Sequence, residues 1–313
     1  MRIFVAGGAG FIGSHLVDYL LRKNRRVTVY DNFSSGRMIH LRHHLNNSLF
    51  RLVEGDLLDK KKLFRSLRGH HFVFHLAANP DIRAGIKKTD LDLEQGTLIT
   101  YRILEAMRIR KINRIAFTSS SVVYGETSAL PIPEDFGPLQ PISLYGAGKL
   151  ASEALLTAFS GTFGFQVWIF RLANIVGTRM THGILYDFRR KIQENPSLLE
   201  ILGDGRQAKS YLHVSECIEA MNHVISHARK KINVFNIGPG ETISVREIAR
   251  LFLRSCGLKN TRLLFSGEKR GWPGDIPRFL LSVKKLEKSG WLARRTSREA
   301  VLAALEELKK CRR

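Results

Sequence analysis

Tyr145 and Lys149 stand four residues apart in the segment LYGAGKL. On a helix, two residues at this spacing lie on the same face, one above the other. A tyrosine hydroxyl has an ordinary pKa of about 10, and a nearby ammonium group favours the phenolate and lowers that value. We therefore expect Lys149 to lower the pKa of Tyr145, and Tyr145 to take a proton from a substrate hydroxyl.

Three consecutive serines, Ser119, Ser120 and Ser121, end the otherwise apolar run INRIAFTSSS. The apolar run predicts a buried strand, so the serines fall at its carboxyl end, where parallel sheets bind ligands. A serine hydroxyl at this point either bonds a substrate oxygen or only caps the end of the strand. The pattern alone leaves both roles open.

Glycines crowd the segment VAGGAGFIGSH, between an apolar run and a helical pattern. In such a turn Gly7 permits the tight bend, Gly10 lets a phosphate approach the backbone, and Gly13 lets the helix pack against the strand. The free N–H groups and the positive dipole end of the helix favour an anion at its N-terminus. The segment therefore predicts a binding site for the pyrophosphate of a dinucleotide.

Asp31 and Asp56 end the next two predicted strands. Asp31 lies 18 residues beyond Gly13, where a carboxylate bonds the ribose hydroxyls and repels the additional phosphate of NADP. This favours NAD as the cofactor, with Asp56 beside the adenine. The positive charge of a nicotinamide would also favour the phenolate of Tyr145.

Short apolar segments alternate with helical patterns through the first half of the chain, which predicts parallel strands joined by crossover helices. Because the crossovers cover both faces, the strands can be apolar throughout. We expect an α/β fold with a doubly wound (Rossmann) parallel sheet and a smaller mixed α/β substrate-binding lobe. The sheet domain is expected at residues 1–174 with a returning strand near 232–238, and the lobe at 175–231 and 239–313. The expected strands are 2–7, 26–31, 49–56, 70–78, 112–121, 165–174 and 234–238, and the helices include 11–23, one from 59, 90–110 and one from 145.

The 313 residues carry 50 Lys and Arg against 28 Asp and Glu, a formal net charge of +22. Such a charge attracts anions such as nucleotides, sugar phosphates or nucleic acid, although the surplus is spread over helical faces that solvent would cover. Three cysteines far apart indicate neither disulfides nor a zinc cluster, and the histidines near 40–44 and 70–71 lack a ligand set, so we expect no metal. No apolar run approaches a membrane span and no signal peptide is visible, so we expect a cytoplasmic location.

The chain resembles the extended short-chain dehydrogenase/reductase superfamily, in its group of sugar-nucleotide epimerases and dehydratases. The motifs that carry the resemblance run in order along nearly the whole chain and include GGAGFIGSH, EGD, HLAA, TSSSVVYG, LYGAGK, RLANIVG, GDGRQ, SYLHV and GWPGD. The closest subgroup is that of the UDP-glucose 4-epimerases. The resemblance thus implies reversible oxidation of the C4 position of a UDP-sugar through a 4-keto sugar, with NAD regenerated in each cycle.

The resemblance also implies residue roles and a homodimer formed through the helices near 90–110 and 145–162. The expected catalytic residues are Ser120, Tyr145 and Lys149, with Ser120 passing a proton to or from Tyr145. Cofactor contacts are expected from Gly7, Gly10, Phe11, Ile12, Asp31, Asn32, Ser34, Ser35, Gly36, Asp56, Leu57, Leu76, Ala77, Ala78, Asn79, Ser119, Tyr145, Lys149 and Ile175. Substrate contacts are expected from Ser120, Ser121, Tyr124, Tyr145, Asn174, Arg206, Lys209, Arg270 and Asp275.

The chain departs from the family pattern at a few positions. Lys209 and Trp272 stand where relatives carry arginines on the diphosphate, and a lysine supplies charge without a bidentate fork; Arg270 and Arg206 could compensate. Gly96 stands where the family usually has an asparagine near the cofactor. No acid adjoins Ser120, which disfavours elimination chemistry.

Two alternatives to the 4-epimerase stay open. One is another nucleotide-sugar enzyme of the superfamily, such as a UDP-uronate epimerase, a decarboxylase or a reductase. The other is a nucleic-acid-binding protein that reuses the fold, which the charge of +22 motivates. The intact set of Ser120, Tyr145 and Lys149 disfavours the second, because a protein that only binds need not keep it.

Overall fold

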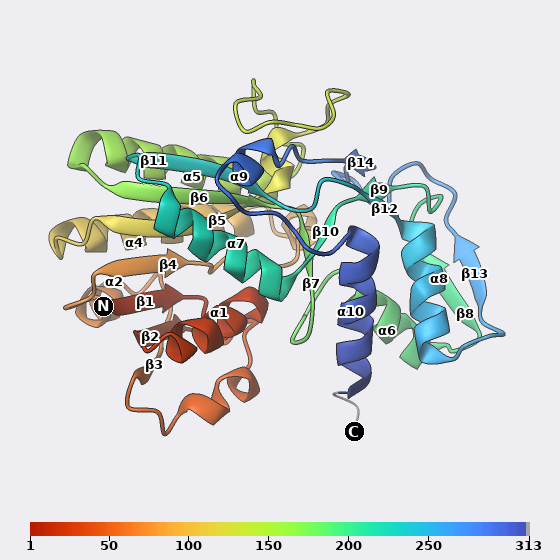
Figure 1. Ribbon diagram of the computed structural model, residues 1–313, viewed down its shortest axis with the longest axis horizontal. Coiled ribbons are helices and arrows are strands. Elements are labelled where there is room, and N and C mark those ends of the chain that lie inside the picture. Colours follow the sequence, from red (N-terminus) through yellow and green to blue (C-terminus); the bar gives the residue numbers. More distant parts are fainter. Residues whose placement is uncertain (311–313) are drawn as a thin grey trace.

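The computed structural model describes residues 1–310 and contains one seven-stranded parallel sheet, in the order β11-β6-β5-β4-β1-β2-β3 (Figure 1). The chain starts in the middle of this sheet, builds outward to β3, and returns past β1 to build the other half, as a doubly wound fold requires. The predicted parallel sheet is thus confirmed. Its strands are β1 (Arg2–Ala6), β2 (Arg26–Asp31), β3 (Phe50–Glu54), β4 (Phe72–His75), β5 (Arg114–Ser120), β6 (Gln166–Leu172) and β11 (Ile232–Ile237).

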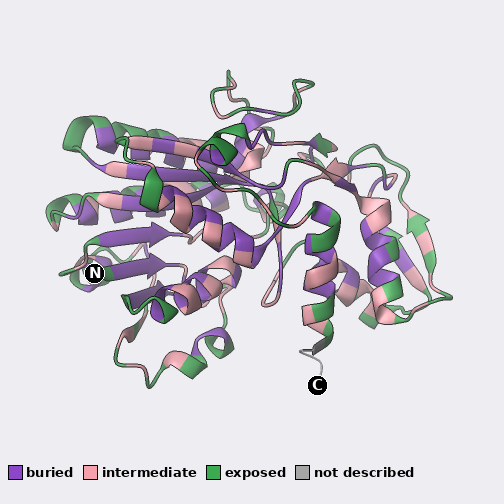
Figure 2. Cartoon of the chain, viewed as in Figure 1, coloured by how far each residue is buried: buried purple, intermediate pink, exposed green. Residues whose placement is uncertain are grey.

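Helices cover both faces of the sheet, so its central strands are buried on both sides (Figure 2). Along β1, Ile3 and Val5 join one core cluster while Phe4 and Ala6 join the other, because successive strand residues point to opposite faces. This explains why the strands read as continuous apolar runs. The first layer contains α1 (Phe11–Arg22) and α7 (Val214–His227), and the second contains α2 (Lys60–Ser66), α4 (Ile99–Ile109) and α5 (Leu144–Phe163).

The helix expected over 90–110 is interrupted. A π-helix, η3 (Leu93–Leu98), precedes α4. Here the chain packs closely on α5, since a Cβ atom added to Gly148 would lie 2.8 Å from the carbonyl oxygen of Asp92. Thr100 donates a hydrogen bond to the carbonyl of Gly96 at 2.7 Å. The widened turn therefore lies against the helix that carries Tyr145 and Lys149.

The second lobe lies beyond the carboxyl ends of the sheet strands and has a core of its own (Figure 1). Helix α7 falls inside the range predicted for this lobe, but its residues Cys217 and Met221 pack with the sheet core. The lobe's helices are α6 (Ile184–Glu194), α8 (Val245–Cys256) and α10 (Ser297–Lys310), and its strands are β8 (Leu198–Ile201), β9 (Ala208–Lys209), β12 (Ile243–Ser244), β13 (Arg262–Phe265) and β14 (Arg278–Phe279). The remaining elements are β7 (Asn174–Val176), β10 (Tyr211–His213), α3 (Ala84–Lys87), α9 (Lys284–Lys288), η1 (Met38–His40), η2 (Arg42–His44) and η4 (Ser121–Tyr124).

Within residues 1–310, none of the helices combines the length and the apolar character that a membrane crossing requires. The thiol of Cys217 is buried in the sheet core. Cys311 lies outside the described residues.

Candidate active site

A pocket of about 950 Å³ opens at the carboxyl edge of the sheet, between the sheet and the second lobe. Its wall includes residues that follow β1, β2, β4, β5 and β6, with further residues from α6 and from the loop before Ile276. The volume is near the upper end of the range for ligand pockets. The pocket therefore lies where a doubly wound sheet binds its ligands.

The glycine turn forms one end of this pocket. Gly7 has a φ of +80°, and a Cβ atom on it would lie 2.6 Å from the backbone nitrogen of Ala77. A Cβ atom on Gly13 would lie 2.1 Å from the carbonyl oxygen of Gly7, so only glycine lets α1 pack this close to β1. Gly10 differs, because its nearest neighbour would be the oxygen of Gly7 at 3.4 Å, which leaves open space towards the pocket.

Helix α1 begins without a side-chain cap at Gly10. The backbone N–H groups of its first turn have no intrahelical acceptor, and their partial positive charge attracts an anion. Phe11 and Ile12, the first two helix residues, line the pocket. The space above Gly10 and the uncapped helix end fit the pyrophosphate of a dinucleotide.

The two strand-end carboxylates lie beside this turn. Asp31 accepts hydrogen bonds from the backbone of Ala9 at 2.8 Å and of Phe33 at 2.9 Å. Burial raises the pKa of Asp31, while these two hydrogen bonds act in the opposite direction. Asp56 accepts a bond from the side chain of Asn32 at 3.1 Å, so both carboxylates are held at the pocket wall on the side expected for adenosine.

The three candidate catalytic side chains meet in the middle of the pocket wall. Helix α5 begins at Leu144 behind the capping side chain of Ser143, which places Tyr145 in its first turn and Lys149 one turn later. Ser120 ends β5 and lines the pocket beside them. The strand end and the helix start thus bring together a hydroxyl, a phenol and an ammonium group.

The protein alone raises the pKa of Tyr145, contrary to the expectation from the sequence. The main cause is burial, the charge of Asp92 adds to it, and a hydrogen bond with Ser120 acts in the opposite direction. The ammonium of Lys149 donates to the carbonyl oxygen of Thr118 at 2.7 Å and lies 5.6 Å from the centroid of the Tyr145 ring. Its hydrogen bond is therefore made to the strand and not to the phenol.

Asp92 is a part of this site that sequence reasoning missed. It is buried, its Oδ1 accepts a bond from Asn79 at 3.1 Å, and its Oδ2 has no hydrogen-bond partner. Burial lowers the pKa of Lys149 to about 8, while the charges of Glu153 and Asp92 act in the opposite direction. Asp92 thus influences both Tyr145 and Lys149, although its place in the sequence gives no sign of it.

A buried ion pair supports the serine strand from behind. Arg171 on β6 lies 2.7 Å from Glu153 on α5, and both side chains are more than nine-tenths buried. The hydroxyl of Ser119 donates to the same carboxylate at 2.5 Å. Ser119 therefore anchors the strand end through its hydroxyl, whereas Ser120 and Ser121 line the pocket without this bond to Glu153.

The second lobe supplies a cation and an acid to the other end of the pocket. Lys209 on β9 pairs with the buried carboxylate of Asp275 at 2.5 Å, and its ammonium lies 5.2 Å from the ring centroid of Trp272. All three residues line the pocket. Lys209, Arg206 and Arg270 were suggested to replace the arginines that bind the diphosphate in relatives. Of these three, Lys209 lines the pocket.

Three residues predicted to contact the substrate lie elsewhere. Tyr124 is buried in a separate core cluster, where its hydroxyl donates to Asn236 at 2.7 Å. Arg270 pairs with Glu126 at 2.5 Å, and Arg206 is exposed on a turn whose backbone N–H bonds Asp204. None of these three side chains lines the pocket, although Arg270 also donates to the carbonyl oxygen of Asp275, a residue of the pocket wall, at 3.0 Å. Their contacts with the substrate stay predictions.

The other predicted residues line the pocket. They are Gly7, Gly10, Phe11, Ile12, Asp31, Asn32, Ser34, Ser35, Gly36, Asp56, Leu57, Leu76, Ala77, Ala78, Asn79, Ser119, Ser120, Ser121, Tyr145, Lys149, Asn174, Ile175, Lys209 and Asp275.

No pattern in the sequence indicated the polar pocket residues that come from α6, from the loop before it and from the turn before α3. His182 and Tyr186 line the pocket, as does Arg83, which lies 3.6 Å from Asp187 of α6. In the sequence Tyr186 resembles the solvent-facing side of an amphipathic helix, while His182 and Arg83 lie outside the helices. Gly96, where the family usually has an asparagine, does not line the pocket, whereas the preceding residue, Gln95, does.

Comparisons with known proteins agree with this geometry. The model of the NAD dependent epimerase/dehydratase family matches residues 3–238. The chain is 31% identical over 255 residues to a UDP-glucose 4-epimerase of Mycolicibacterium smegmatis, covering 79% of this chain and 80% of that protein. Other relatives bear the names of decarboxylases and dehydratases of nucleotide sugars.

Solved structures of nucleotide-sugar epimerases are also similar to this chain over nearly its whole length. A crystal structure of a UDP-galactose 4-epimerase is 36% identical, with a TM-score of 0.89 and 99% of each chain covered. A UDP-glucuronic acid 4-epimerase from Bacillus cereus, in complex with UDP-glucuronic acid and NAD, is 26% identical, with a TM-score of 0.90, covering 99% of this chain and all of that one (100%).

Proposed function

The chain belongs to the NAD-dependent epimerase/dehydratase family, and from that premise we propose that it is a UDP-glucose 4-epimerase, which interconverts UDP-glucose and UDP-galactose in galactose metabolism. The observation that carries the proposal is the meeting of Ser120, Tyr145 and Lys149 on one pocket wall, between the glycine turn and the cation of the second lobe. This arrangement supports a nucleotide sugar held at its diphosphate end while its ring faces the phenol.

The chain's own residues account for the proton transfers. Tyr145 removes the proton of the sugar 4-hydroxyl and returns it, with Ser120 bonded to the phenol as a relay. Lys149 is held 5.6 Å from the centroid of the Tyr145 ring by its hydrogen bond to the carbonyl oxygen of Thr118, so its charge lies near the phenol without bonding it. When bound above Gly10, NAD supplies a reversible hydride acceptor for carbon C4 of the sugar.

A change of configuration needs a sugar ring that turns over while its nucleotide stays in place. Lys209 supports the anchoring of the diphosphate, since its ammonium faces the pocket from the second lobe. No acid stands beside Ser120, as the segment TSSSVVYG shows. Elimination of a hydroxyl group is therefore less well supported than simple epimerisation.

The alternative substrate with a specific observation in its favour is UDP-glucuronate, because the structure of an epimerase for that sugar superimposes closely. Its additional carboxylate would need a cation. In the pocket Arg83 pairs with Asp187, and Lys191 pairs with Glu200 at 3.1 Å. Lys209 is likewise paired with Asp275, so all three of these pocket cations have a carboxylate partner, and the assay below compares the neutral hexose with the uronate directly.

We propose that the active form is a homodimer. Apolar side chains are exposed on the two helices predicted to form its interface, including Tyr101 and Ile109 on α4 and Phe163 on α5. Tyr101 lies near Phe159 with ring centroids 6.5 Å apart, and Phe159 near Phe163 at 5.1 Å. The exposed rings of Tyr101 and Phe163 thus flank the buried ring of Phe159, and together with Ile109 they form an apolar ridge over both helices that is suited to a second copy.

The test is an assay of the purified chain with added NAD on UDP-glucose, UDP-galactose and UDP-glucuronate. We expect interconversion of the two hexoses and a loss of about 10²–10⁴-fold in kcat for Tyr145→Phe. Tyr124→Phe is the matched control, because it removes a hydroxyl that bonds Asn236 outside the pocket. Conversion of UDP-glucuronate alone, or equal activity of Tyr145→Phe and wild type, would overturn the proposal.

A further inference from the structure

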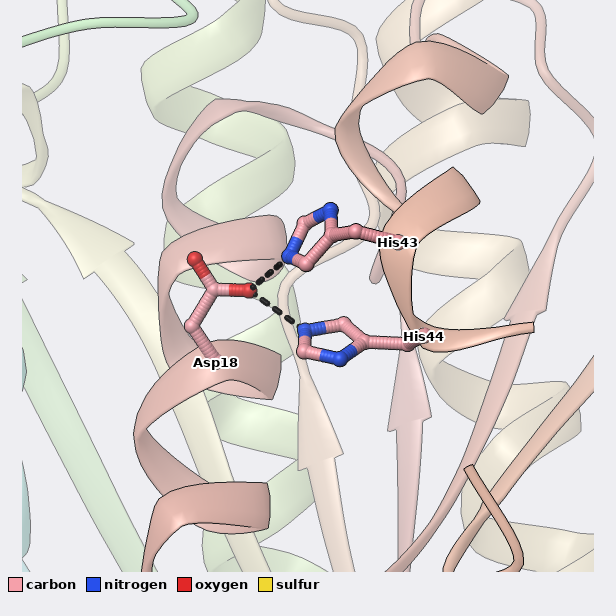
Figure 3. Close-up of side chains that lie close together, drawn as sticks. All are labelled: Asp18, His43 and His44. Carbon is pink, nitrogen blue, oxygen red and sulfur yellow. Dashed lines mark hydrogen bonds and ion pairs between the residues drawn. The ribbon is translucent and has the colours of Figure 1, made fainter. Parts of the chain in front are cut away.

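Two adjacent histidines converge on one carboxylate outside the pocket. The Nε2 atoms of His43 and His44, on η2, lie 3.1 Å and 2.7 Å from the same oxygen, Oδ1, of Asp18 on α1 (Figure 3). The two rings lie side by side with centroids 3.9 Å apart. One nitrogen from each ring thus points at the same carboxylate oxygen.

The three side chains are held in place by their surroundings. Asp18 and His44 are 14% exposed, whereas His43 is 50% exposed and leaves one side open to solvent. Arg179 donates to the second oxygen of Asp18 at 2.9 Å. That contact fixes the orientation of the carboxylate, as groups behind the ligands do in metal sites.

We propose that Asp18, His43 and His44 bind a divalent transition metal ion of the zinc type. Two imidazoles and one carboxylate are a common donor set for Zn²⁺, and water completes the coordination where the protein gives three ligands. The mutual spacing supports this, because the three donor atoms lie within 4.8 Å of one another. Binding needs a lone pair on each Nε2, so the proton of each ring moves to Nδ1 and the ion replaces the two hydrogen bonds.

The site joins the cofactor side of the sheet domain to α1. The segment between β2 and β3 also contacts the glycine turn, since the backbone nitrogen of Arg37 and the side chain of His40 each lie 3.1 Å from the carbonyl oxygen of Ala9. A metal ion at His43 and His44 would clip this segment to α1. We therefore expect the ion to stabilise the folded protein, because it binds the folded chain and finds no assembled site in the unfolded one.

The sequence-based expectation of no metal considered the histidines alone. Asp18 comes 25 and 26 residues before them and reaches them only through the packing of α1 on the β2–β3 segment. None of the three side chains takes part in the proposed reaction, so the metal site is independent of that reaction.

The experiment is calorimetric titration of the full, metal-free chain with Zn²⁺, alongside Co²⁺ titration followed by visible absorption. We expect one ion per chain, intensified Co²⁺ bands, and an affinity loss of at least about tenfold for His44→Gln and for His43→Gln. His43 is half-exposed, so its variant should fold even if changes at the less exposed His44 do not.

The matched control is His227→Gln. His223 and His227 stack on α7 with centroids 4.1 Å apart, which gives two imidazoles without the carboxylate. Zn²⁺ binding that is unchanged in His227→Gln and lost in His43→Gln supports the proposed site. Binding that is lost in the control and kept in His43→Gln, or a chain that takes up no stoichiometric ion, overturns it.

Discussion

Two residues of the proposed catalytic set share one buried acidic neighbour. The carboxylate of Asp92 raises the pKa of both Tyr145 and Lys149, and its Oδ2 is buried without a hydrogen bond. If Tyr145 acts as a base, its pKa sets the acidic limb of the rate profile. If the ammonium of Lys149 supports that base, loss of its proton sets the alkaline limb. Because the protein alone raises the pKa of Tyr145, this order of the two limbs requires bound NAD, whose positive charge lowers the pKa of the phenol.

Replacement of Asp92 by asparagine removes this charge and keeps the shape. We expect the pKa of both groups to fall, so that both limbs of the pH profile of kcat/KM move to lower pH. The measurement is that profile for Asp92→Asn beside wild type. Asp135→Asn is a suitable control, because Asp135 is exposed and is not among the residues that line the pocket. A profile that stays in place would show that Asp92 has no electrostatic influence on the site.

At this scale the sequence predicted the residues that adjoin strand ends and missed those defined by distant partners. Ser120, Asp31 and Gly10 lie at the pocket because each belongs to a local pattern of strand and turn. Tyr124 bonds a residue 112 positions away, and Arg270 bonds one 144 positions away. No local pattern contains those partners, so only the folded chain reveals where these side chains lie.

At the scale of elements, the turn between β1 and α1 depends on close backbone contact. Gly13→Ala would place a Cβ atom 2.1 Å from the carbonyl oxygen of Gly7, so either the helix or the turn must move. Overpacking of this kind costs about 1–3 kcal/mol of unfolding free energy. We expect a lower Tm and weaker NAD binding, measured by thermal unfolding with and without NAD.

Gly161→Ala is the matched control for this change. Gly161 lies in the last turn of α5, and a Cβ atom there would meet no atom within 4 Å. The added side chain should leave stability unchanged or raise it by up to about 1 kcal/mol. Equal melting temperatures for the two variants would contradict the close-packing account of Gly13.

The strands and most helices were predictable because their apolar periods are local. The π-helix before α4 was not, since helical periodicity over 90–110 says nothing about the contact between Asp92 and Gly148. Helix α7 was likewise placed with the lobe, because its amphipathic pattern does not tell which core it joins. These features are decided by packing between elements that are far apart in sequence.

At the scale of the whole molecule, the net charge of +22 opposes self-association. The free energy that a homodimer gains by burying the apolar ridge on α4 and α5 must therefore exceed the free energy that repulsion between the two positively charged chains costs. Added salt at 0.1 M largely screens the repulsion between like charges that lie more than about 10 Å apart. We expect the dissociation constant of the dimer to fall as salt is raised, in contrast to the binding of anionic ligands, which salt weakens.

Light scattering at micromolar concentration, repeated over a salt series, measures this balance. Phe163→Glu places a carboxylate in the ridge beside Phe159, so it should shift the mass towards that of a monomer. Leu292→Glu is the control, because Leu292 is 65% exposed and lies outside both helices. A wild-type chain that stays monomeric throughout the series would contradict the dimer. A dimer that Phe163→Glu leaves intact would place the interface elsewhere, because the proposed contact buries the exposed apolar side chains of α4 and α5.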